Sequence, residues 1–197
     1  MRLISFIFFC FYCVTVSAAS SFLPNANIVK IHGQAFIDKE KIEEGAEVAK
    51  GMEIKIPKKG DYVIIKYQNG HKVRLSGAIV KVEELTEKSS LLNLIKGEIH
   101  TLVKTLTKDE KFIIKTKYAS FAVRGTKFGI NLDEEKKKAY LCVCEGVVSA
   151  TQKNMSVDVG KNEDLWVGMN AAKLDVKQST PAMFNMTNDI IEEMDKL

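Results

Sequence analysis

The sequence has few of the residues that mark specialised classes of protein. Of its 197 residues only three are proline and twelve are glycine, and aromatic residues make up 8%. This composition excludes a collagen-like chain and a low-complexity disordered one. An excess of one charge is also missing, because 29 lysines and arginines stand against 25 aspartates and glutamates, for a net charge of +4. The sequence therefore indicates an ordinary globular domain and gives no basis for a nucleic-acid-binding surface.

Long hydrophobic runs are missing from the chain after its first residues. At the start, Arg2 precedes an uncharged and mostly apolar run over Leu3–Val16, and small residues follow at 17–19. Such a basic start, apolar segment and small residues are typical of a secretory signal peptide. We predict a signal peptide over residues 1–18, cleaved after Ala18 or the next residue, and hence an exported protein with no transmembrane span after leader removal. The alternative is an uncleaved anchor, although the run is shorter than the roughly 20 residues that span a bilayer.

Cysteine is scarce, and only Cys142 and Cys144 lie outside the predicted leader. They stand two residues apart in an apolar run with strand character, so their side chains point to one face with Cβ atoms about 6.6 Å apart. A disulfide needs its Cβ atoms about 3.5–4.5 Å apart, which excludes a bridge between the two. None of the three histidines has the spacing of a metal ligand with them or with another histidine. We predict two free thiols, no disulfide and no metal site, with an intermolecular bridge as the alternative.

Sequence motifs of catalysis are missing as well. The chain has no glycine-rich phosphate loop, no G-x-S-x-G and no H-E-x-x-H. Its adjacent acid pairs, Glu43-Glu44 and Glu83-Glu84, would point to opposite faces of a strand. We therefore predict a protein that is not an enzyme and binds no cofactor. Carboxylates that only folding brings together, as in a glycan hydrolase, stay open as the alternative.

What the chain does contain is a long succession of short strand patterns. Alternation or short apolar runs predict strands at 28–31, 53–56, 62–67, 71–75, 78–82, 91–95, 98–103, 112–116, 121–123, 128–132, 139–143, 147–151 and 156–159. Turn residues separate them, among them Asn69-Gly70, Gly77, Gly97 and Gly146. Glycines recur about every twenty residues, a spacing compatible with a coiled β array. We predict an all-β fold, specifically a β-solenoid of short strands with rungs of about 20 residues.

Only the last residues have a helical pattern. Thr180 can act as the N-cap, with Pro181 at the first helical position. Apolar residues then recur at steps of three and four, at Met183, Met186, Ile190, Met194 and Leu197. We predict a short amphipathic helix over 180–197 that covers an open end or face of the β domain. Docking on a partner is the alternative.

The segment from residue 112 to 150 carries a recognisable motif. Its first part is Ala122-Val123-Arg124-Gly125-Thr126-Lys127-Phe128, and its second part, after a charged loop, is Glu145-Gly146-Val147-Val148. Together they resemble the signature of the FecR domain, a strand with an A-V-R-G-T-x-F core, a variable loop and a strand that ends in E-G-x-V. Steps around Gly51, Asn69-Gly70 and Gly97 are similar to earlier parts of that family's pattern. The resemblance covers residues 28–173.

The resemblance implies a FecR-like β domain over residues 28–173 in a bacterial protein of the periplasm or cell envelope. FecR-like domains occur in the periplasmic parts of signalling relays. The expected function is therefore a non-enzymatic binding or signalling-scaffold module that contacts a protein or an envelope polymer. The cytoplasmic regulator segment of such relays is not expected here, because residues 1–18 are predicted to be a leader. An envelope glycan-active enzyme or a glycan-binding accessory protein is the alternative.

The chemistry of the motif residues predicts what they do. Gly125 allows a sharp bend or a close approach of two backbones. Arg124 is one of only two arginines after the leader, so the bend is expected to need its planar, five-donor guanidinium. We predict that Arg124 clamps turn carbonyls or Glu145, with binding of an anionic ligand as the alternative, and that Thr126 bonds within the same turn. The motif set, expected to be mainly structural, is Ala122, Val123, Arg124, Gly125, Thr126, Phe128, Glu145 and Gly146.

Overall fold

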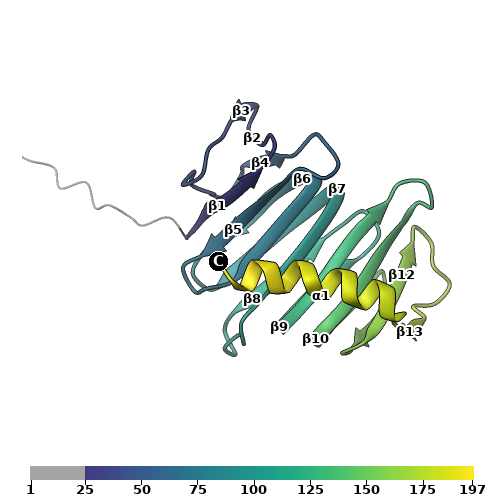
Figure 1. The fold of residues 1–197 in the computed structure, drawn as a ribbon. Coiled ribbons are helices and arrows are strands. Elements are labelled where there is room, and N and C mark those ends of the chain that lie inside the picture. Colours follow the sequence, from purple (N-terminus) through teal and green to yellow (C-terminus); the bar gives the residue numbers. More distant parts are fainter. Residues whose placement is uncertain (1–24) are drawn as a thin grey trace, which may run out of the picture.

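Thirteen strands form one open sheet in the described part of the chain, and one helix lies across it (Figure 1). A computed structural model describes residues 25–197, so the predicted signal peptide lies outside the described residues. The elements are β1 (Ala26–His32), β2 (Phe36–Ile37), β3 (Glu40–Lys41), β4 (Glu53–Lys55), β5 (Tyr62–Tyr67), β6 (Lys72–Leu85), β7 (Ser89–Leu102), β8 (Lys111–Lys115), β9 (Ser120–Asp133), β10 (Lys138–Gln152), β11 (Met155–Val159), β12 (Glu163–Gly168), β13 (Val176–Gln178) and α1 (Pro181–Asp195). The prediction of a β fold with one short C-terminal helix is confirmed.

Four strands, β6, β7, β9 and β10, are longer than the sequence patterns predict. Each of them joins two of the expected short strands into one. The glycines that were expected to end strands, Gly77, Gly97 and Gly146, lie inside β6, β7 and β10, where the pairing between strands shifts register. A bulge of this kind bends a strand without ending it. The turns predicted at these three glycines are therefore wrong.

The bends divide the sheet into two halves that share the four long strands. In what we call the front half, the pairing order is β1, β5, then the 72–76 part of β6, the 98–102 part of β7, the 127–133 part of β9, the 138–143 part of β10, β12 and β13. In the rear half the order is β3, β2, β4, then the remaining parts of β6 and β7, β8, the remaining parts of β9 and β10, and β11. In folds made of two packed sheets, strands that pass from one sheet to the other at a bulge form the corners. The four long strands form corners of this kind between the front half and the rear half.

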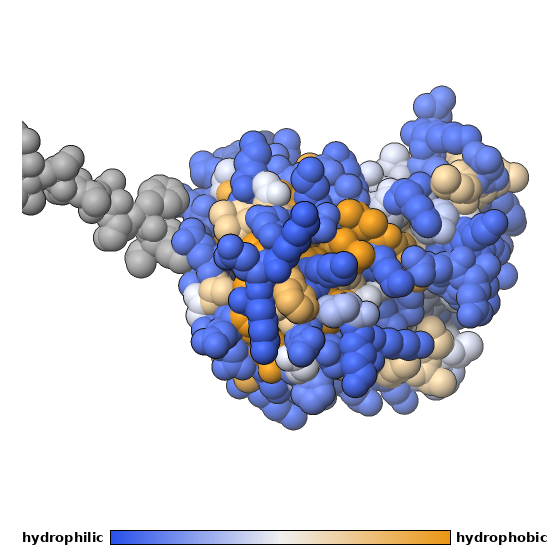
Figure 2. Space-filling model, turned by 90° about the horizontal axis from the view of Figure 1, so that it is seen from above, coloured by the Kyte–Doolittle hydropathy of each residue, from blue (hydrophilic) through white to orange (hydrophobic). Residues whose placement is uncertain are grey.

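The apolar side chains of both halves belong to one core. Val73 and Leu75 of the front half and Val80 and Phe112 of the rear half are fully buried in the same cluster. Seen from above, apolar residues show near the middle of the molecule with hydrophilic residues around them (Figure 2). Burying this apolar surface is the main favourable contribution to folding.

The solenoid and its rungs of about twenty residues are not confirmed. The pattern that does repeat is a hairpin of two bent strands, β6–β7 and β9–β10. Gly77 and Gly125 are each the sixth residue of the first strand, and Gly97 and Gly146 are each the ninth residue of the second. Gly125 follows Gly77 by 48 residues, so the spacing near twenty mixes glycines of bulges with glycines of turns.

The helix α1 begins where the sequence predicts. The side chain of Thr180 accepts a hydrogen bond from the backbone N–H of Met183, and Pro181 occupies the first turn. The buried face, which consists of Thr187, Ile191 and Met194, agrees with the predicted stripe at Met194 but not at Met186, which is 51% exposed. This face lies against β6, β7, β9 and β10, on the outer side of the front half (Figure 1). In residues 25–197 no helix has the length and apolar character needed to cross a membrane.

Candidate functional site

The motif residues lie at a corner where β9 and β10 pass together from the front half to the rear half. Gly125 and Gly146 have backbone φ angles of +62° and +82°. A Cβ atom on Gly146 would overlap the carbonyl oxygen of Gly125 and lie 2.5 Å from Cγ2 of Thr126. A Cβ atom on Gly125 would lie 3.1 Å from Cα of Thr105. Only glycine fits this approach of the two backbones without strain.

The other motif residues divide between the core and the surface. Val123 and Phe128 are buried in the core, whereas Ala122 is exposed. Thr126 is buried, and its backbone carbonyl accepts a hydrogen bond of 2.9 Å from the N–H of Val103. Its hydroxyl has no hydrogen-bond partner among residues 25–197, so the predicted local bond of this side chain is not formed.

Arg124 is not a clamp in this structure. The side chain is exposed, and within residues 25–197 it forms no hydrogen bond or ion pair. The carboxylate of Glu145, its expected partner, lies 3.3 Å from Nζ of Lys127 instead. The predicted clamp is therefore not formed, and the alternative, an arginine available to an anionic group, agrees with the geometry.

Arg124 lies on the outer face of the rear half, beside apolar residues. It pairs across the strands with Val147, which is 46% exposed. Leu91, Ile113 and Ala122 form an adjacent row across β7, β8 and β9, through the pairs of Leu91 with Ile113 and of Ile113 with Ala122. We call these five residues the rear face. A cationic group bordered by exposed apolar side chains is suited to contact with a protein surface.

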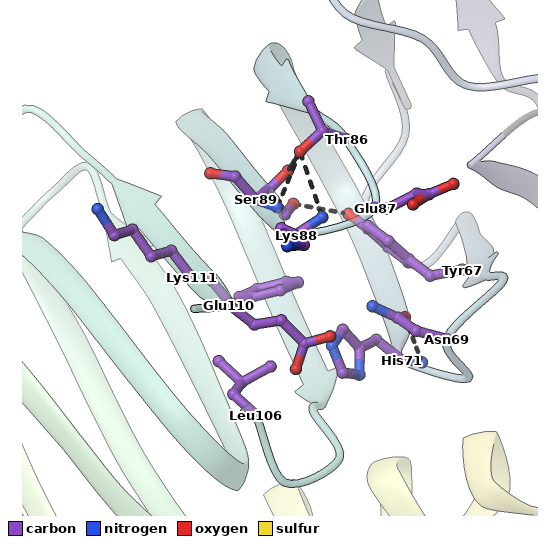
Figure 3. Close-up of a pocket in the computed structure, with 12 residues that line it drawn as sticks. Tyr67, Asn69, His71, Thr86, Glu87, Lys88, Ser89, Leu106, Glu110 and Lys111 are labelled. Carbon is purple, nitrogen blue, oxygen red and sulfur yellow. Dashed lines mark hydrogen bonds between the residues drawn. The ribbon is translucent and has the colours of Figure 1, made fainter. Parts of the chain in front are cut away.

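A second candidate, a small cavity, lies around Tyr67 and His71 at one end of the sheet (Figure 3). The Tyr67 hydroxyl lies 3.2 Å from Oγ of Ser90, and burial raises the pKa of Tyr67 to about 12. Nδ1 of His71 accepts a hydrogen bond of 3.2 Å from the N–H of Lys104, and its ring meets that of Phe112 edge-on at 5.9 Å. Burial lowers the pKa of His71, partly offset by the carboxylate of Glu110. These side chains are satisfied by neighbours in the fold.

The space around these residues is small. The cavity measures about 10 Å³, enough for about one water molecule. A neighbouring hollow of about 260 Å³ is lined by Asn25, Tyr67, Gln68, Asn69, Thr86 and Glu87. Pockets for small organic ligands measure about 300–1,000 Å³. The geometry therefore favours the exposed rear face over this cavity as a site of function.

Cys142 and Cys144 are free thiols, both buried on β10 beneath α1. Sγ of Cys142 lies 3.7 Å from Oγ of Ser179, and the nearby Asp164 accepts a hydrogen bond of 2.7 Å from the Tyr140 hydroxyl. Hydrogen bonding to Cys142 and burial raise the pKa of Cys144, which holds this thiol protonated. Within residues 25–197 no three His, Cys, Asp or Glu side chains are grouped as a metal site would need.

Residues 52–149, which include β4 to β9 and most of β10, match the family model FecR, described as FecR protein. The chain carries a domain of the FecR family. The resemblance seen in its motif is thereby confirmed, and the matched residues contain the corner and the rear face. The helix α1 lies outside the match.

Two crystal structures have a similar fold, at 2.50 and 1.65 Å resolution, both of a protein described as an anti-sigma factor from Parabacteroides distasonis. Each is 22% identical to this chain with a TM-score of 0.56, and each comparison covers 64% of this chain and 59% of the other. The FecR-domain chain thus spans about three fifths of the length of these proteins. At this identity the likeness shows the fold. No curated protein matches the chain.

Proposed function

We propose that this protein is an exported, non-enzymatic FecR module that binds a partner in the cell envelope and serves as a scaffold in signalling. The observation that carries the proposal is the exposed, unpaired Arg124 in the motif of the FecR domain. The family is regulatory rather than enzymatic, and the predicted leader supports a place in the periplasm. The proposed partner is a protein or an envelope polymer that presents an anionic group.

The rear face can recognise such a partner through a combination of charge and apolar contact. The guanidinium of Arg124 offers five N–H donors in one plane and binds a carboxylate through two parallel hydrogen bonds. Val147 and Ala122 beside it are exposed, so a partner's apolar side chains would bury them on binding. Charged hydrogen bonds of this kind contribute about 1.5–3 kcal/mol each.

To test the proposal, the wild-type protein, its Arg124→Ala variant and a Lys161→Ala control are each immobilised and incubated with an envelope extract. The amount of the extract's components that each protein retains is then compared. Lys161 is exposed and has no partner within residues 25–197, so its variant loses the same charge at another place. We expect Arg124→Ala to melt within about 2 °C of wild type, since it removes no contact. The Arg124→Ala variant should nevertheless no longer retain the envelope partner, whereas the Lys161→Ala control should retain it as wild type does.

Equal retention of both variants would show that the rear face is not the binding site. Incubation of the wild-type protein with purified envelope polymers completes the test, because cleavage of a polymer would overturn the non-enzymatic part of the proposal. Release of a chain that begins at Ala19 or Ser20 by osmotic shock is the expected result for its location.

A further inference from the structure

The front half carries a row of side chains that follows the axis of α1. The row takes one residue from each of six neighbouring strands, through direct pairs between Ile64, Arg74, His100, Gly129, Cys142 and Asp164. The helix crosses these same strands in Figure 1. Ser179, just before the helix, contacts Cys142 and Asp164, and Glu193 near its end pairs with Arg74. We call this row the helix seat.

Gly129 gives the seat its shape. A Cβ atom on this residue would lie 2.8 Å from Cδ2 of His100 and 3.0 Å from Cγ2 of Thr187 on α1. Thr187 is only 2% exposed, so its side chain is enclosed between the helix and the sheet at this point. The glycine makes a notch that receives one small side chain of a helix. Ile191, one turn later, then packs on Leu102 and Cys144.

Three of the six seat residues carry polar side chains: Arg74, His100 and Asp164. Nδ1 of His100 and Nε of Arg74 are buried with no hydrogen-bond partner among residues 25–197. Buried polar groups without partners are unfavourable, and exposure to water would satisfy them. Uncovering the seat would therefore let water satisfy these two groups, which offsets part of the cost of exposing the apolar contacts of Ile191, whereas exposure of the core face, with Val73 and Leu75, has no such compensation.

Charge holds the C-terminal end of α1 to the seat. Glu193 lies 3.2 Å from both Lys30 and Arg74, Asp195 lies 3.8 Å from Lys72, and Nζ of Lys66 donates to the backbone carbonyl of Leu197 at 3.2 Å. The guanidinium of Arg74 also lies 3.7 Å from the ring centroid of Tyr62. Basic residues around the Arg74 end of the seat thus face the acidic end of the helix.

The same acidic residues weaken α1 as an isolated helix. They lie in its last turn, which has no basic residue, and the first turn has no acidic one. Negative charge at a helix C-terminus opposes the helix dipole, and isolated helices of about 15 residues are marginal in water. The helix therefore depends on the seat for its stability more than the seat depends on the helix.

We infer that the helix seat is a binding site for an acidic amphipathic helix of a partner protein, and that α1 occupies it as an intramolecular competitor. The partner helix needs a small residue for the Gly129 notch, an apolar residue four positions later and an acidic residue two positions after that, as Thr187, Ile191 and Glu193 provide in α1. Five of the six seat residues lie within the FecR match and α1 lies outside it. The inference goes beyond the proposed function, because the seat and the rear face belong to different halves of the sheet.

A fluorescent peptide of residues 179–197 tests whether the seat binds a helix supplied from outside. The full chain with Ile191→Asp, whose own helix should leave the seat, is expected to bind the peptide. Wild type should bind it at least about tenfold more weakly, because a tethered helix competes at a high effective concentration. A peptide with Glu193→Lys should bind the variant at least about tenfold more weakly than the native peptide. A chain with Met186→Asp, a change on the exposed side of α1, serves as the control and should behave like wild type.

The buried thiols supply a second measurement that does not depend on Ile191→Asp. The rate at which a thiol reagent labels the segment 139–153 under native conditions measures how often Cys142 and Cys144, which lie in this segment, become accessible to solvent. Glu193→Lys, a change at a half-exposed side chain, should accelerate the labelling while circular dichroism shows an intact sheet, and added salt should accelerate it in wild type. Absence of peptide binding to a folded Ile191→Asp chain, or labelling as slow in Glu193→Lys as in wild type, would overturn the inference.

Discussion

Gly146 shows how a single missing side chain can determine a corner of the sheet. Gly146→Ala would place a Cβ atom against the carbonyl oxygen of Gly125 and add the strain of a φ of +82°. We expect a loss of at least about 2 kcal/mol of unfolding free energy, or about 4–8 °C in melting temperature for a chain of this size. Thermal melts followed by circular dichroism measure it.

Gly51→Ala is the matched control for this prediction. Gly51 has a similar φ of +95°, but nothing lies within 4 Å of the position its Cβ would take. Its variant should therefore lose only the strain of the backbone, about 1 kcal/mol, which corresponds to about 2–4 °C. Equal losses at the two positions would mean that the approach of the backbones at the corner does not constrain the fold.

His100 makes the stability of the protein sensitive to pH. Burial, and next the charge of Arg74, lowers the pKa of His100 to about 4 in the folded chain. In the unfolded chain its pKa returns to about 6.5, so between pH 6.5 and 4 the unfolded chain binds a proton that the folded chain excludes. The free energy of unfolding should therefore fall as the pH falls through this window, by up to about 3 kcal/mol.

Melting temperatures of wild type and His100→Asn between pH 7.5 and 4 test this dependence. Burial lowers the pKa of His71 as well, so some dependence on pH should remain in the variant. The slope for His100→Asn should be clearly shallower than that for wild type. Parallel curves would show that the protonation of His100 is not linked to folding.

For Arg124, the sequence reveals that the residue belongs to a motif but not where its side chain points. Its rarity among lysines and its position beside Gly125 indicate an important residue, and the motif is recognisable from the sequence. The direction of its side chain was not predicted, because it depends on whether the strand ends at Gly125 or continues through it, and the approach of Gly146 to Gly125 determines this. Arg124 follows the buried Val123 and precedes the bulge, so it points outward, away from the expected carbonyls.

At the scale of elements, most strands were predictable, but β2, β3, β12 and β13 and the continuity of the four long strands were not. Short apolar runs such as those of β5 and β8 place these strands correctly. Gly97 is a bulge rather than a turn because it lies opposite Gly77 in the partner strand, and a Cβ on it would overlap the Gly77 carbonyl. That match between two strands is not visible in either strand alone. β12 was missed because its buried Asp164, which is satisfied by Tyr140, interrupts an apolar pattern.

The docking of α1 should be sensitive to one methyl group on β9. Gly129→Ala would place a Cβ atom in the notch, against His100 and Thr187, and push the helix away from the sheet. We expect faster thiol labelling of Cys142 and Cys144 with little change in strand content. Gly168→Ala, where the nearest atom would be at an ordinary 3.6 Å, is the control and should label like wild type. Slow labelling of Gly129→Ala would contradict a close fit at the notch.

At the scale of the whole molecule, the two halves of the sheet should unfold together. Each of the four long strands contributes residues to both halves, and both halves share one core. Neither half can lose its strands without removing those of the other. We expect a single calorimetric transition whose calorimetric and van't Hoff enthalpies agree.

Two spectroscopic probes complete this test. Trp166 is on β12 at one side of the sheet, so its fluorescence reports locally, whereas far-ultraviolet circular dichroism reports on all strands. Their melting curves should coincide with the calorimetric one. A separate transition for Trp166 would mean that the β12 end of the sheet unfolds on its own.

The row of six residues beneath α1 has a consequence for the order of folding. Because each residue of the row comes from a different strand, the surface that receives the helix exists only after all six strands have paired in register. Helix α1 then gains its native contacts only after these six strands, and we expect the contacts to be absent from the transition state. Truncation of Ile191 should accelerate unfolding and leave the rate of folding unchanged. The docked helix thus slows the unfolding of a sheet that has already formed.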